Sequence, residues 1–91
     1  MPLFRCFVRG DNLPPMKGFK GLMGFYTTRW VEASTAEDAE LIALEMLRSE
    51  FQFSEKQKQK APDARVYFEE IIEVEPDNTR NPNSGATWFE M

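Results

Sequence analysis

The 91-residue chain contains no histidine and only one cysteine, Cys6. Histidine is the commonest general base near neutral pH and the commonest neutral metal ligand, so the sequence lacks the usual residue for both roles. A single cysteine can form neither an internal disulfide nor a thiolate cage for zinc. We therefore expect a protein that is not an enzyme and holds no metal or other cofactor, with Cys6 as a buried, unreactive thiol.

Long apolar runs are also missing. No stretch approaches the roughly 20 apolar residues of a membrane-spanning helix, and no basic start precedes an apolar segment as in a signal peptide. Together with the lone cysteine, this predicts a cytoplasmic protein with no membrane partner. The apolar fraction of 42% and the charged fraction of 29% are typical of a globular chain. The length predicts a single domain over residues 1–91 with a thin core.

The basic and acidic residues are unevenly distributed along the chain, whose net charge is −4. Residues 1–30 contain five basic and one acidic side chain, whereas residues 62–91 contain two basic and seven acidic ones. Opposite charges on two segments of a small domain neutralise each other most simply across a β-sheet. Because the sequence also lacks the run of basic and aromatic residues of RNA-binding sheets, we do not expect nucleic acid as a partner.

The hydrophobic pattern predicts the element order β-β-α-β-β. Alternating apolar residues predict strands over 3–9, about 22–33 and 64–75, and a short last strand over 86–91. The pattern of the second strand does not decide which of its faces points inward. Polar, proline-rich or glycine-rich segments predict mobile loops at about 10–21, 55–62 and 76–85.

Ser34 and Thr35 are helix-capping residues that precede an amphipathic segment. We expect a helix from residue 35 or 36 to about residue 51, with an apolar stripe that packs on the sheet. In the third strand, Glu70 interrupts the apolar alternation, which indicates a bulge or the end of the sheet.

A right-handed crossover through this helix places the third strand beside the first. We therefore predict an α+β fold, half-ferredoxin-like, with a four-stranded antiparallel sheet in the order 2-1-3-4 and one helix on one face. The uncovered face is expected to carry a central group and a charged rim. The central group is Phe7, Tyr67 and Ile71, and the rim is Arg5, Arg9, Glu69 and Glu73. A mixed surface of this kind suits burial by a twofold partner, so the leading hypothesis is a protein-interaction domain whose partners are a second copy of the chain and another protein.

Two other chemistries compete with this hypothesis. The loop over residues 10–21 combines glycines with Lys17, Phe19 and Lys20, and Arg29 is expected nearby, so a small-molecule or phosphate-binding module is an alternative. The loop matches no phosphate-binding spacing and leads into a strand, not a helix. The adjacent carboxylates of Glu69 and Glu70 are not expected to act together, because neighbouring residues of a strand point to opposite faces.

The segment Gly24-Phe25-Tyr26-Thr27-Thr28-Arg29-Trp30-Val31-Glu32-Ala33, followed by the capped helix that starts Ala36-Glu37-Asp38-Ala39-Glu40, resembles a group of small bacterial α+β proteins. The resemblance covers roughly residues 19–50 and implies no function. In outline the chain is also similar to compact antitoxin-like partner-binding folds, although it shows no DNA-binding helix-turn-helix. The resemblance implies a third alternative, an antitoxin-like regulator that acts by binding a partner.

Overall fold

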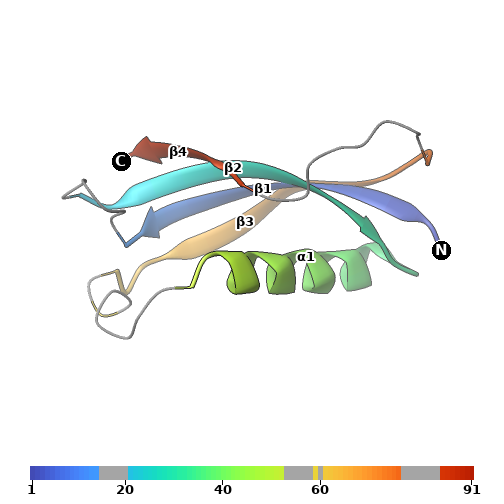
Figure 1. Cartoon of the computed structure of the whole chain (residues 1–91), viewed down its shortest axis with the longest axis horizontal. Coiled ribbons are helices and arrows are strands. Elements are labelled where there is room, and N and C mark those ends of the chain that lie inside the picture. Colours follow the sequence, from blue (N-terminus) through green and yellow to red (C-terminus); the bar gives the residue numbers. More distant parts are fainter. Residues whose placement is uncertain (15–20, 53–58, 60, 77–84) are drawn as a thin grey trace.

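A computed structural model of the chain describes residues 1–14, 21–52, 59, 61–76 and 85–91. The elements of these residues are one antiparallel sheet and a helix against one of its faces, so the predicted α+β class and element order are confirmed (Figure 1). The elements are β1 (Leu3–Leu13), β2 (Met23–Glu32), α1 (Ala36–Glu50), β3 (Arg65–Val74) and β4 (Thr87–Glu90). In the described part of the chain, no helix is both long and apolar enough to cross a membrane.

The strand order is β3-β1-β2-β4. As predicted, β1 lies between β2 and β3, but the predicted order 2-1-3-4 is wrong because β4 joins β2 and not β3. The edge of β2 suits β4 because Gly24 leaves room there for the ring of Phe89. The outer edge of β3 carries several glutamates, and a strand that brings Glu90 would add a further negative charge.

The helix forms where local signals predict it. Thr35 is the N-cap, and its side-chain oxygen accepts a hydrogen bond of 3.1 Å from the backbone N–H of Asp38. Glu37 and Asp38 lie in the first turn, where negative charge is favourable, and Phe51 caps the other end. The side chains that α1 buries against the sheet are Ala39, Ala43 and Leu47. Because two of these three are alanines, the helix lies close to the strands.

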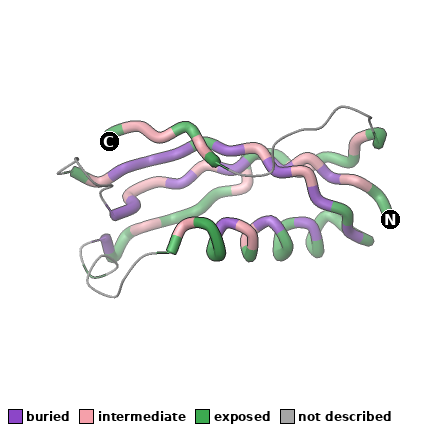
Figure 2. Tube along the Cα trace, viewed as in Figure 1, coloured by how far each residue is buried: buried purple, intermediate pink, exposed green. Residues whose placement is uncertain are grey.

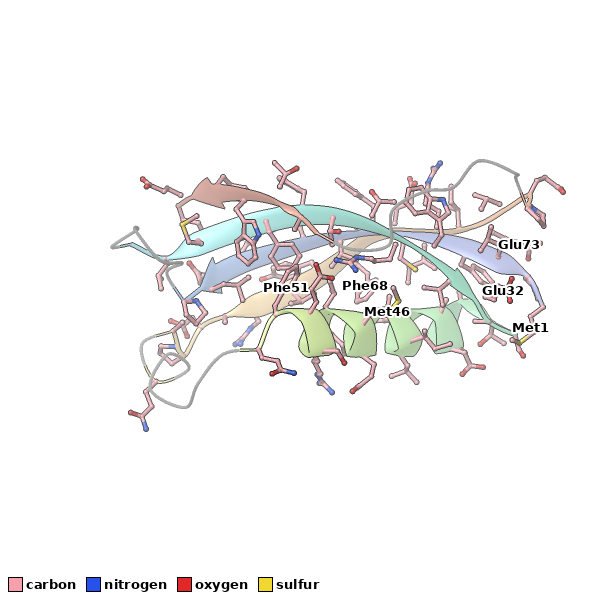
Figure 3. The ribbon with its side chains drawn as sticks, in the orientation of Figure 1. Met1, Glu32, Met46, Phe51, Phe68 and Glu73 are labelled. Carbon is pink, nitrogen blue, oxygen red and sulfur yellow. The ribbon has the colours of Figure 1, made fainter. Side chains whose placement is uncertain are left out.

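The inward face of β2, which its pattern leaves open, is the face of Phe25 and Val31. These residues pair with Gly10 and Phe4 of β1, so their side chains point toward α1 together with Cys6 and Val8. Cys6 is fully buried, as predicted. Figure 2 shows that the buried residues gather in the middle strands and recur at intervals along α1. In Figure 3 the side chains of Met46, Phe51 and Phe68 lie between α1 and the sheet.

A bulge in β3 decides which of its residues face α1. Phe7 of β1 pairs with Glu70, but the next residue, Val8, pairs with Phe68, so Glu69 has no residue opposite it in β1. Beyond the bulge, Ile71 lies opposite the fully buried Cys6 and packs against the core. The predicted bulge near Glu70 is therefore confirmed.

The same bulge corrects two expected positions. Ile71 lies on the helix side of the sheet and not on the uncovered face, and Glu73, opposite the buried Phe4, lies on the helix side as well. Ile72, opposite Arg5, takes the position expected for Ile71.

The first predicted loop begins later than expected, because β1 continues to Leu13. The register with β2 shifts between Gly10 and Leu13, and Asn12 adopts φ 57° at this irregularity. Asparagine tolerates this left-handed conformation better than most residues. Residues 15–20, 53–58, 60 and 77–84, where the three mobile loops were predicted, lie outside the described residues.

Candidate functional site

The side of the sheet opposite α1 is the main candidate site, and we call it the open face. No described helix or strand lies over it (Figure 1). The cross-strand register places the following side chains on it: Leu3, Arg5, Phe7, Arg9 and Asp11 of β1, Tyr26, Thr28, Trp30 and Glu32 of β2, Arg65, Tyr67, Glu70, Ile72 and Val74 of β3, and Phe89 of β4.

Three aromatic rings form a row across β1, β2 and β4 on this face. The rings of Phe7 and Tyr26 stack almost in parallel, with centroids 5.6 Å apart and an interplanar angle of 7°. The ring of Phe89 follows with its centroid 5.4 Å from that of Tyr26. Phe7 and Tyr26 remain 37% and 39% exposed. The row is therefore a rigid apolar surface that the described part of the chain leaves in contact with solvent.

Charged pairs border the row along β1 and β3. Arg5 bonds Glu70 at 3.2 Å, and Arg9 bonds Glu69 at 3.3 Å. The Arg9 guanidinium also lies 5.0 Å from the centroid of the Tyr67 ring. The bulge explains the paired glutamates, because it turns both Glu69 and Glu70 toward the arginines of one face. The expectation that these two carboxylates point to opposite faces is therefore wrong.

Five of the seven predicted interface residues come together on the open face. They are Phe7, Tyr67, Arg5, Arg9 and Glu69. The predicted set did not include Glu70, the partner of Arg5, or the large apolar side chains of Tyr26, Trp30, Ile72 and Phe89. The alternation of β2 contains the signal for Tyr26 and Trp30, but the polar side chains of Thr27 and Arg29 on the inward face concealed it.

A shallow hollow of about 440 Å³ lies beside the aromatic row. Its lining residues are Phe7, Tyr26, Thr27, Thr28, Trp30, Gly85, Ala86 and Thr87. The described residues of the lining offer aromatic rings and threonine hydroxyls, and none of them is a carboxylate, lysine or arginine. Such a hollow can accept an apolar side chain.

Arg29 occupies a different place from the one expected. It lies on the helix side of the sheet with only 1% of its side chain exposed, and its guanidinium bonds the carboxylate of Glu50 at 2.8 Å. Along the chain it is eight residues, or roughly 26 Å of extended chain, from Gly21, where the predicted ligand loop ends. The other residues predicted there, Lys17, Phe19 and Lys20, lie outside the described residues.

Arg29 and Glu50 together hold Gly85, which lies two residues before β4. Arg29 donates to the carbonyl oxygen of Gly85 at 2.9 Å and to the hydroxyl of Thr27 at 3.2 Å, and the N–H of Gly85 donates to Glu50. Burial alone raises the pKa of the Glu50 carboxyl, but these hydrogen bonds and the positive charge of Arg29 outweigh it and lower the pKa. We call this group the Arg29–Glu50–Gly85 clasp; it joins the end of α1 to the start of β4.

The thiol of Cys6 is not a candidate nucleophile. Burial raises its pKa, and the nearby negative charge of Glu40 raises it further, so the thiol stays protonated. Among the described residues, no three His, Cys, Asp or Glu side chains come close enough together to hold a metal ion.

Comparison of the chain with models of known protein families, with curated proteins and with solved structures gave no match.

Proposed function

We propose that the chain is a non-enzymatic protein-interaction domain of the cytoplasm that forms a homodimer through its open face. The observation that carries this proposal is the aromatic row of the exposed Phe7 and Tyr26 and the half-buried Phe89, which no described element of the chain covers. Aromatic side chains are enriched at the centres of protein interfaces, where they bury a large area at little cost in conformational entropy. In a half-ferredoxin-like arrangement one helix covers one face of the sheet, so the other face is available to a partner.

The outer edge of β3 is a less suitable place for association. A sheet edge pairs readily with another strand when it is long, flat and apolar. The edge of β3 has a bulge at its centre and carries Glu69, Glu70 and Glu73. Two copies of β3 paired about a central twofold axis bring these glutamates together, which is unfavourable. The geometry therefore favours contact through the face.

The charge of the open face is compatible with a second copy of the same face. It has three basic and four acidic side chains, namely Arg5, Arg9, Arg65, Asp11, Glu32, Glu69 and Glu70. Because the signs nearly balance, a twofold partner meets no strong repulsion. Three strands of about ten residues and one of four cover roughly 540 Å² in projection. A stable interface buries about 800 Å² of accessible surface per partner, so the dimer uses nearly the whole open face together with the relief of its side chains.

The proposal is tested by light scattering coupled to gel filtration at tens of micromolar. We expect a mass of two chains for the wild type and of one chain for Tyr67→Asp and Ile72→Asp, because each puts a charge among the apolar groups of the interface. The control is Leu41→Asp on the outer side of α1, where Leu41 is already 65% exposed. We expect this substitution to leave the mass at two chains.

Two outcomes contradict the proposal. One is a wild-type mass of one chain, and the other is a dimer that neither aspartate substitution on the open face affects. A thermal-shift screen against nucleotides and inorganic anions tests the alternative of a phosphate-binding module. A ligand that raises the melting temperature of a monomeric wild type supports that alternative.

A further inference from the structure

β4 lies on β2 in the manner of a bound peptide. It is four residues long and, of the strands that the structure describes, pairs with β2 alone, with the register running from Met23 opposite Glu90 to Tyr26 opposite Thr87. The N–H of Met91 extends the pairing by donating to the carbonyl of Leu22 at 3.1 Å. Main-chain pairing of this kind is how extended peptides add to the edge of a sheet.

Two large side chains of β4, those of Trp88 and Phe89, pack on opposite faces of the sheet. We call the place where each ring packs against β2 its seat. On the helix side, the Trp88 ring packs 5.3 Å from the ring of Phe25 and 5.2 Å from that of Phe51, measured between centroids. On the open face, the Phe89 ring lies directly over Gly24, where any Cβ atom would overlap it. The Phe89 ring can pack there because Gly24 has no side chain.

The Arg29–Glu50–Gly85 clasp supplies a third contact, in which two side chains bind the backbone of Gly85. It engages both the N–H and the carbonyl of Gly85. Gly85 has φ 80°, a left-handed conformation that glycine adopts without a steric cost. The edge of β2 thus recognises a glycine, two spacer residues and then a Trp-Phe pair.

The occupant is much less buried than the site it covers. None of the residues 85–91 is fully buried, whereas Met23 and Phe25 of β2 are each only 1% exposed. Departure of β4 therefore exposes an apolar strip and an unpaired strand edge, which another segment of the same chemistry can cover.

We infer that the edge of β2 at Met23–Tyr26, with the seats of Trp88 and Phe89 and the clasp, is a strand-acceptor site that binds residues 85–91 of a second copy of the chain in place of its own. The second copy is the partner that the chemistry specifies, because its β4 carries the glycine and the two aromatic rings that the site fits. This exchange is separate from association through the open face and does not depend on it.

The test uses a fluorescently labelled peptide of residues 85–91 and the full chain. The chain carries Ile72→Asp, so that open-face association does not contribute. We expect saturable binding of the peptide, weakened by competition from the chain's own β4. The double substitution Trp88→Ala and Phe89→Ala loosens that β4 but leaves the acceptor intact, so it tightens peptide binding at least about tenfold. The single substitution Phe89→Ala tightens it less.

Gly24→Ala is the matched control in the acceptor, because its methyl group fills the Phe89 seat and should abolish binding. A peptide in which alanine replaces both aromatic residues should not bind. The inference is overturned if the labelled peptide shows no saturable binding to either Phe89 variant at millimolar concentration, provided that circular dichroism shows the variant to be folded. Equal binding to the Gly24→Ala chain overturns it as well.

Discussion

Arg29 is a charged side chain in the middle of the core, and its replacement by methionine tests the clasp most severely. Methionine fills a similar volume without the charge, so the change removes the hydrogen bonds and leaves little cavity. The guanidinium donates to Glu50 at 2.8 Å, to Gly85 at 2.9 Å and to Thr27 at 3.2 Å. Hydrogen bonds to a charged group contribute about 1.5–3 kcal/mol each before the cost of burying the charge is subtracted.

We expect Arg29→Met to lower the free energy of unfolding by about 2 kcal/mol. Breaking a fully buried ion pair costs about 3–5 kcal/mol. The cost is smaller here because 28% of the Glu50 side chain is exposed, so water can hydrate the carboxylate that the substitution leaves behind. A loss of about 2 kcal/mol corresponds to a drop of roughly 8–16 °C in melting temperature for a domain of this size.

The assay is urea unfolding followed by the fluorescence of Trp30 and Trp88. The matched control is Arg48→Met in the last turn of α1, where the arginine side chain is 69% exposed and lies 3.8 Å from Glu45. Such a surface pair changes stability by less than about 1 kcal/mol. If Arg29→Met and Arg48→Met shift the urea midpoint equally, the clasp contributes nothing to stability and the reasoning is refuted.

Three further predictions concern Glu50, Gly10 and Cys6. Because the folded pKa of Glu50 is lowered, its contribution is present above its ordinary pKa of about 4.3 and is lost as pH falls through the folded pKa. The stability difference between wild type and Glu50→Gln should therefore shrink from pH 5 to pH 3 in urea titrations, and a constant difference contradicts the assignment. Gly10→Ala should cost about 1–3 kcal/mol because its methyl group overlaps the ring of Phe25, whereas Gly21→Ala, with open space around it, should be nearly neutral in the same assay. Cys6 should react with a thiol reagent only on unfolding, and rapid labelling of the folded protein would contradict its burial.

Local features of the fold could be predicted from the sequence because their causes are local. The helix begins at the residue after Thr35, whose capping hydrogen bond depends only on the next three residues. Phe4, Cys6 and Val8 alternate in one strand, so they share a face in any sheet that buries them. The register around Glu70 was predictable only as an irregularity. Which of Ile71 and Ile72 faces α1 depends on where the extra residue of the bulge falls, and that is set by the pairing with β1.

The features that were not predictable depend on contacts between distant segments. The position of β4 is decided by the space over Gly24, which has a meaning only once Phe89 is beside it. Arg29, together with Thr27, interrupts the apolar inward pattern of β2, and the sequence pattern predicts an exposed position for such a charged residue. Its burial is possible because Glu50 and Gly85, respectively 21 and 56 residues further along the chain, meet it on the helix side of the sheet. The aromatic row was not predicted because Tyr26 belongs to β2, and the polar Thr27 and Arg29 hid which face of this strand points inward.

The most direct test of the central claim is site-specific photo-crosslinking from position 7. A benzophenone amino acid in place of Phe7 lies in the middle of the open face, next to Tyr26. The same group in place of the exposed Leu41, on α1, is the control. We predict that irradiation at tens of micromolar gives a crosslinked dimer from position 7 alone, with the crosslink mapped to open-face residues of β1, β2 or β3 in the second copy. Absence of a dimer from position 7, or crosslinks from it to α1 of the second copy, would contradict association through the open face.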